Sequence, residues 1–249
     1  MPDRRPPRRL TARSVVLSVL LGAHPAHASA AELIRLTGDF GIRDATLRVA
    51  LTRLVGSGDL IRSADGYRLS PRLLARQRRQ DEALHPRAAR WTGHWTTLIV
   101  TGVADNARSR AELRTTLQRH RFAALREGVW MRPDNLPIAL DAATSARLRV
   151  LRSHDDAPRQ LAAQLWDLSG WARDGGALLH QMAAAGDVPG RFTVAAAIVR
   201  LLLTDPVLPA ELLPADWPGD RLRRAYREFV AEFSARLTAD TAPASVEVS

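Results

Sequence analysis

The sequence predicts an α+β protein in three parts, because three patterns follow one another along the chain. The first 70 residues contain short amphipathic helices and end in a hairpin, residues 95–151 alternate strand and helix, and from about residue 157 the pattern is almost wholly helical. With 249 residues and 46% apolar side chains, the chain can bury more than one core. We therefore expect domains at residues 1–90, 91–156 and 157–249.

The first part opens with two short helices. Residues 12–21 have valines and leucines at helical spacing. Farther along, Ser29 precedes Glu32 by three residues, which is the capping-box pattern at the start of a second helix. A glycine-containing turn at residues 38–41 then leads into a third helix.

The third helix, which Gly58 closes, has two faces of different chemistry. Its inner stripe is spaced for burial and consists of Leu47, Ala50, Leu51, Leu54 and Val55. The outer face carries small residues, hydroxyls and arginines without a carboxylate, which are the groups that enter a major groove: arginine can bind guanine, and threonine or valine can contact a thymine methyl. The candidate DNA-binding residues here are Thr46, Val49, Thr52 and Arg53, with Arg43 and Arg48 at the flanks. An ordinary solvated helix face is the alternative.

A hairpin follows this helix directly. Leu60 begins a short strand, an Asp-Gly turn lies at residues 65–66, and residues 67–69 return as the second strand. Arg62 and Arg68 lie on these strands, where they can meet phosphate or a minor groove. Three helices and a hairpin outline a winged helix-turn-helix, so double-stranded DNA is the first partner to test. RNA, an anionic membrane or an acidic protein could use the same basic surface.

The charge distribution supports a polyanionic partner. Residues 1–90 contain 17 arginines against 8 acidic residues, whereas residues 91–249 contain 19 against 18, so nearly all of the net charge of +10 belongs to the first third. Such a local excess is typical of nucleic-acid binding. Basic segments flank the hairpin unit on both sides. The segment from Pro2 to Arg13 is either a backbone-tracking arm or a solvated tail, and residues 71–90 read as a helix broken near Pro86.

Composition also indicates the compartment. The chain has no cysteine, which excludes disulfides and thiol chemistry and fits a reducing cytoplasm. No run of about 18 apolar residues occurs, so we expect no membrane span. The arginine-rich start and the apolar residues after it resemble a secretory signal superficially, but the apolar run is short and completes the three-helix unit. We therefore expect a cytoplasmic protein.

The middle and last parts differ in their patterns. Strands are expected at residues 95–102, 128–133 and 147–151, with a helix at residues 107–120 after the first of them. This alternation predicts a small α/β domain of the ferredoxin-like kind. The remaining residues form helices separated by the proline-rich segment at residues 205–219.

Four segments resemble the PaaX family of bacterial transcriptional regulators. FGIRDATLRVALTRLV, with the core from Arg48 to Leu54, is similar to the family's recognition segment, and GVWMRP resembles its Gly-Val-Trp strand. LWDL and especially DPVLPAELLPADWPG, which begins at Asp205, resemble signatures near the end of the family. These segments span most of the chain in the family's order. The resemblance implies a winged helix, a ferredoxin-like domain and a C-terminal helical domain.

The resemblance also implies how the protein acts. It implies a homodimeric repressor of phenylacetate-type catabolic genes that leaves its operator when an acyl-CoA effector, typically phenylacetyl-CoA, binds. Two features depart from the family. Arg43 stands where relatives commonly have a capping serine, although Asp44 could take that role. Residues 136–156 are alanine-rich and match poorly, so a different pathway and effector are the alternative.

An enzyme is the rival class. The expected central fold resembles that of the small CRISPR integrase subunit, whose relatives hold a metal with an acidic residue at the end of the first strand. That strand end here reads Ile-Val-Thr-Gly, with Asp105 as the nearest carboxylate, so a nuclease is disfavoured. His24 and His27 lack further ligands nearby, and no phosphate-binding glycine loop is present. We expect no catalytic residue, metal or cofactor, and the six tryptophans are expected to pack in cores.

Overall fold

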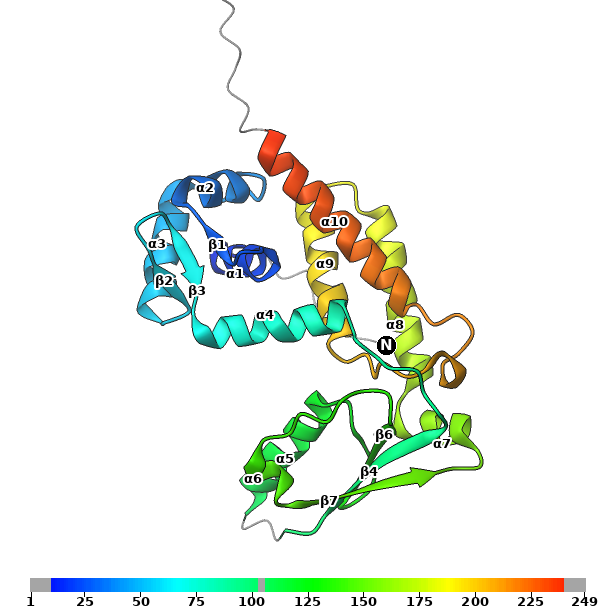
Figure 1. The fold of residues 1–249 in the computed structure, drawn as a ribbon. Helices are drawn as coiled ribbons and strands as arrows, with labels where there is room; N and C mark the ends of the chain where they lie inside the picture. Colours follow the sequence, from blue (N-terminus) through cyan, green and yellow to red (C-terminus); the bar gives the residue numbers. More distant parts are fainter. Residues whose placement is uncertain (1–9, 103–105, 240–249) are drawn as a thin grey trace, which may run out of the picture. The chain divides into compact units, whose positions relative to one another are not determined.

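The computed structural model of the chain describes residues 10–102 and 106–239 (Figure 1). The chain divides into two compact units. The first comprises residues 1–84, 178–200 and 221–249, and the second comprises residues 85–177 and 201–220. The fold is α+β, as the sequence predicts, and each unit is described by itself.

The first unit begins with a winged helix-turn-helix. Its helices are α1 (Ala12–Gly22), α2 (Ala30–Gly38), α3 (Asp44–Gly56) and α4 (Pro71–Leu84). Its sheet contains β1 (His27–Ala28), β2 (Leu60–Arg62) and β3 (Tyr67–Leu69) in the order β1-β3-β2, with antiparallel pairing throughout. The predicted capping box is present at α2, where the Ser29 hydroxyl accepts from the Glu32 N–H and the Glu32 carboxylate accepts from the Ser29 N–H. The strand β1 is an addition to the predicted hairpin.

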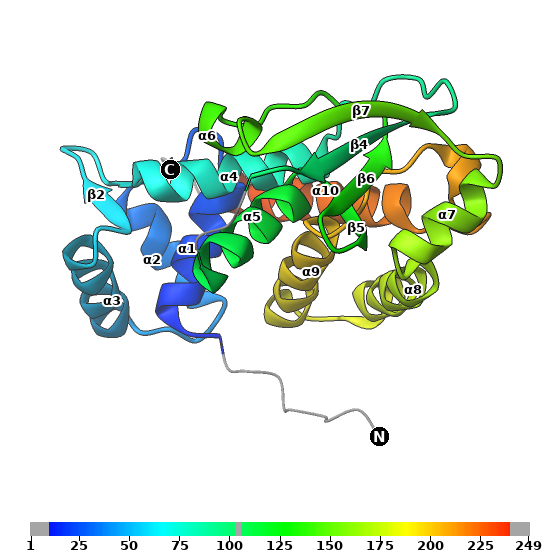
Figure 2. The same cartoon turned by 90° about the horizontal axis from the view of Figure 1, so that it is seen from below.

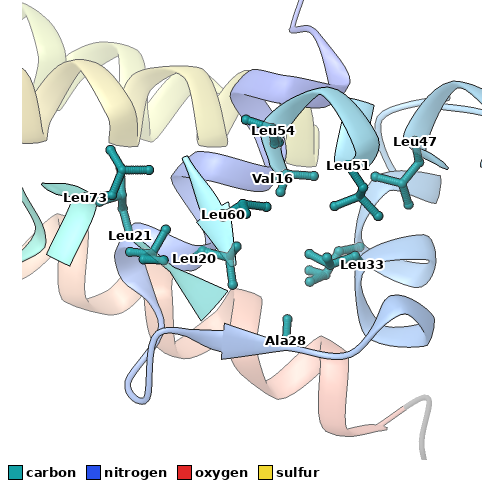
Figure 3. Packing of buried hydrophobic residues seen from close by; sticks show 12 residues of the cluster. Val16, Leu20, Leu21, Ala28, Leu33, Leu47, Leu51, Leu54, Leu60 and Leu73 are labelled. Atoms are coloured by element: carbon teal, nitrogen blue, oxygen red, sulfur yellow. The ribbon is translucent and has the colours of Figure 1, made fainter. Parts of the chain in front are cut away.

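One leucine-rich core holds this domain together. Figure 3 shows side chains from α1, α2, α3, β1, β2 and α4 converging on the same interior. Leu47, Leu51 and Leu54, the centre of the predicted stripe on α3, are at most 3% exposed. Burying a leucine side chain contributes roughly 1.5–3 kcal/mol, so this stripe fixes which face of α3 is left for solvent.

Parts of three further helices complete the first unit. They are the end of α8 (Leu168–Ala184), most of α9 (Val188–Leu202) and most of α10 (Gly219–Ala239). Phe192 of α9 packs on Phe229 and Phe233 of α10, with ring centroids 6.3 and 6.0 Å apart. The rings of Phe192 and of Phe40, which precedes α3, form a T-shaped pair with centroids 5.0 Å apart. An aromatic cluster therefore joins the C-terminal helices to the domain that carries α3.

The second unit contains the expected ferredoxin-like domain. Its elements are β4 (His94–Val100), α5 (Ala107–Arg119), β5 (Ala123–Arg126), β6 (Val129–Pro133), α6 (Ala142–Ser145) and β7 (Leu148–His154). The sheet order is β5-β6-β4-β7 and every pair is antiparallel (Figure 2). This β-α-β-β-α-β succession is the ferredoxin-like arrangement. The strand β5 was not expected, since its residues Ala-Ala-Leu-Arg have no strand preference.

Tryptophans fill the core beside this sheet. Trp95, which is fully buried, lies against Trp91 and Trp166, and Trp171 stacks on Trp217 at 4.2 Å. They pack with α7 (Pro158–Leu165), the start of α8 (Leu168–Ala184) and the 3-10 turn η1 (Ala210–Leu212). Five of the six tryptophans therefore pack against another tryptophan ring in this unit.

A buried arginine fixes the loop after β6. Arg132 is 2% exposed and donates to the carbonyls of His120, Leu136 and Pro137, while its guanidinium lies 4.6 Å from the centre of the Phe122 ring. Burial lowers the pKa of Arg132 to about 10. This arginine therefore serves the fold of the second unit rather than the basic surface. Within the described residues, no helix has the length and apolar character needed to cross a membrane.

Candidate nucleic-acid interface

The ends of α3 are set by local sequence. Arg43 occupies the N-cap position and its side chain makes no capping hydrogen bond, while Asp44 lies in the first helical turn. The expectation that Asp44 caps the helix is therefore wrong, because its carboxylate lies one residue too far along and can act only on the helix dipole. At the other end, Gly58 has φ +68° and donates to Val55, and Asp59 N–H donates to Leu54. These two bonds are those of a Schellman motif, which confirms the predicted glycine cap.

All eight candidate residues are exposed. On α3 the solvent face presents Thr46, Val49, Thr52 and Arg53, and 51% of Val49 is open to solvent despite its apolar side chain. The Thr52 hydroxyl donates to the carbonyl of Arg48 at 3.0 Å, which leaves its oxygen lone pairs available to an outside donor. Arg43 lies at the start of α3 and Arg48 on its side. The remaining two candidates, Arg62 and Arg68, are on the hairpin.

The hairpin has a close neighbour in β1. Its turn closes with the Ser63 N–H donating to the Gly66 carbonyl, and Arg62 pairs opposite Tyr67. A Cβ at Gly66 would lie 2.4 Å from the carbonyl oxygen of Ala28, so only glycine lets β1 run beside the turn. Arg68 lies on the central strand β3, opposite Ile61 on one side and His27 on the other.

The arginines of this region fall into two groups. Within the described residues, none of the five candidate arginines forms an ion pair with a carboxylate. By contrast, Arg13 and Arg72 both donate to the buried carboxylate of Asp59, from Arg13 Nη2 at 2.8 Å to Oδ2 and from Arg72 Nη2 to Oδ1. The positive charges of the five candidate arginines are therefore not offset by an ion pair within the described residues, and an outside anion can bind them.

Sequence reasoning missed two organising residues. Asp59 is 2% exposed and also accepts a hydrogen bond from the Ser57 hydroxyl at 3.1 Å, so it ties α1 and α4 to the root of the hairpin. Gln77 of α4 is buried and its amide donates to the carbonyls of Leu20, Leu21 and Ala23. These carbonyls end α1 and have no intrahelical donor. For Gln77, the only signal in the sequence was a polar residue on the face of α4 that also carries Leu73 and Leu84.

Other residues singled out from the sequence lie beside a carboxylate or fall outside the described residues. Residues 2–9 of the basic arm and Asp105 lie outside the described residues. His24 lies 3.1 Å from the Asp81 carboxylate, and His27 lies 3.3 Å from that of Asp65. Among the described residues, no group of three or more His, Cys, Asp or Glu side chains is placed to hold a metal ion.

Comparison with known families covers most of the chain in three matches. Residues 11–73 match the model described as PaaX-like protein, residues 88–154 match the PaaX protein central Cas2-like domain, and residues 178–242 match the PaaX-like protein C-terminal domain. The chain belongs to the PaaX family. These family domains indicate a regulator of transcription.

A solved structure shares this architecture. The PaaX-like chain is similar to uncharacterized protein Rv0674 from Mycobacterium tuberculosis, with 65% sequence identity and a TM-score of 0.85. The match covers 93% of this chain and 99% of that one. No curated protein matches the chain. The relative thus supports the fold and the family, and carries no statement about ligand or target.

Proposed function

We propose that this PaaX-family regulator binds double-stranded DNA through the outer face of α3. The observation that carries the proposal is the exposure of Thr46, Val49, Thr52 and Arg53 on one helix face, opposite a fully packed leucine stripe. A helix with this composition fits a major groove, where arginine binds guanine and the methyl groups of valine or threonine contact thymine. Thr46, Val49, Thr52 and Arg53 are the proposed base contacts.

The hairpin and the flanking arginines supply the second part of the interface. Arg62 and Arg68 are exposed and have no ion pair within the described residues, so each can meet a phosphate. Arg43 and Arg48 flank the base-contacting face on α3. Phosphate contacts fix the position of the protein on the duplex and give the affinity its dependence on salt.

The regulatory part of the proposal rests on the family resemblance. We propose a cytoplasmic homodimer that represses aromatic-acid catabolic genes and leaves its operator when phenylacetyl-CoA or a related acyl-CoA binds. Dimerisation has an independent reason, because one winged helix contacts a short half-site and a two-fold pair doubles the base contacts. A different acyl-CoA, or a regulator of another pathway, is the alternative. The alanine-rich segment at residues 136–156 gives it no support, because the match to the central family domain extends to residue 154.

Fluorescence anisotropy tests this function. A labelled duplex from the intergenic region upstream of the protein's own gene is titrated with the full chain, and unlabelled random duplex of equal length competes at the same salt concentration. Specific binding of the upstream duplex, released by phenylacetyl-CoA, is expected. Equal competition by random DNA would contradict a specific regulator, and binding that phenylacetyl-CoA leaves unchanged would contradict that effector alone.

A further inference from the structure

A hollow lies between the start of α1 and the outer face of α3. Its volume is about 670 Å³, and α3 contributes Thr46, Val49 and Arg53 from the proposed base-contacting face. The opposite wall comes from α1 and includes Thr11 and Arg13. The first helix therefore borders the surface that the DNA would meet, although the sequence assigned it only to the core.

The chemistry of the lining suits an anion with an apolar neighbour. Two guanidinium groups, of Arg13 and Arg53, stand among alanines and Val49. The first turn of α1 contains no acidic residue. The Thr11 hydroxyl accepts from the Ser14 N–H, while the N–H groups of Ala12 and Arg13 have no intrahelical acceptor. A phosphate and the sugar next to it present this combination of charge and apolar surface.

Arg13 is held in place for such a contact. Its Nη2 donates to the buried Asp59 carboxylate, while 56% of its side chain is exposed. A guanidinium has five N–H donors, so the remaining ones stay available to a second acceptor. Asp59 also binds Arg72, so one buried carboxylate faces two arginines and the cluster keeps a net positive charge.

We propose that this hollow receives a phosphodiester of the DNA backbone, with Arg13 as its charged contact and Asp59 as the residue that positions Arg13. The inference rests on the proposed function, since it places a backbone contact beside the base-contacting helix. It assigns α1 to the interface, in addition to α3 and the hairpin. Asp59 then acts through Arg13 and touches no DNA itself.

The test compares Arg13→Ala with wild type on a random-sequence duplex, because a phosphate contact needs no operator. Affinity at low salt should fall on the order of tenfold, and the slope of log K against log salt should become shallower by about 1. Arg13→Lys keeps the charge and should keep the slope. Arg108→Ala is the matched control: it removes the same charge from an exposed, ion-paired site on α5 and should leave both quantities unchanged.

A second variant tests the hollow without changing charge. Ala45 is exposed on α3 and lines the hollow, and leucine there keeps a helix-favouring residue while filling the space. Ala45→Leu should weaken binding of random duplex and retain the melting temperature. Unchanged salt slopes in Arg13→Ala together with unchanged affinity in Ala45→Leu would overturn the inference and leave the proposed function standing. A wild-type chain that binds no DNA would overturn both.

Discussion

Replacing Gly66 with alanine should destabilise the first unit more than the same change at Gly58. At Gly58 the φ angle is +68° and a Cβ would meet no heavy atom within 4 Å, so the cost is conformational only, about 1–2 kcal/mol. At Gly66 the Cβ would lie 2.4 Å from the Ala28 carbonyl oxygen and 2.8 Å from the Ser29 Cα. Both are backbone atoms, so β1 must move away from the hairpin.

The size of the effect follows from what β1 loses. The strand pairs with β3 through His27 and Ala28, and each backbone hydrogen bond contributes about 0.5–1.5 kcal/mol. Overpacking itself costs about 1–3 kcal/mol. We therefore expect Gly66→Ala to lower the free energy of unfolding by about 2–4 kcal/mol and Gly58→Ala by about 1–2 kcal/mol.

Urea unfolding followed by far-ultraviolet circular dichroism measures both variants. Tryptophan fluorescence reports on the second unit, since all six tryptophans lie there, and gives an internal reference. Hydrogen exchange adds a local probe, because the Leu69 N–H donates to the Ala26 carbonyl at 3.2 Å and should exchange faster in Gly66→Ala. Equal urea midpoints for the two variants, with wild-type exchange at Leu69, would refute the close approach of β1.

Three further predictions concern the same domain. Arg68→Ala should weaken binding to upstream and random duplex by similar factors, and the slope of log K against log salt should become shallower by about 1. An unchanged slope in these titrations would show that the hairpin does not contact the DNA. Gln77→Leu should cost about 1–3 kcal/mol in urea unfolding, because three carbonyls at the end of α1 lose their donor; wild-type stability would show that water replaces the amide. The hydrogen bond from the Ser29 N–H lowers the pKa of Glu32 below its usual 4.5. Glu32→Ala should therefore be less stable than wild type above pH 4.5, and the difference in free energy of unfolding should shrink as the pH falls below 4.5. A difference that does not change with pH would contradict the capping box.

The helices and the hairpin could be predicted because short-range patterns determine them. The 3.6-residue spacing of Leu47, Leu51 and Leu54 fixed both faces of α3, and Asp65-Gly66 marked the turn. The strands β1 and β5 could not be predicted in this way. His27–Ala28 and Ala123–Arg126 have no strand preference of their own, and each exists because a distant strand pairs with it.

Charge counting was informative about the region and uninformative about single arginines. The excess of basic residues before residue 91 identified the basic domain, yet Arg13 and Arg72 share the buried Asp59, a pairing that only the folded chain creates. The eight candidate positions are all exposed, as an interface requires, and their contacts with DNA stay predictions. The three-domain division at residues 90 and 156 also stays a prediction.

The ratio of upstream to random duplex affinity in Arg53→Ala, measured at one salt concentration, tests most directly whether the outer face of α3 contacts bases. A bidentate contact to a base contributes about 1–3 kcal/mol, so the variant should lose that much on the upstream duplex and less on random DNA, and the ratio should fall. An equal loss on both duplexes, or no loss on either, would contradict base contact by this face.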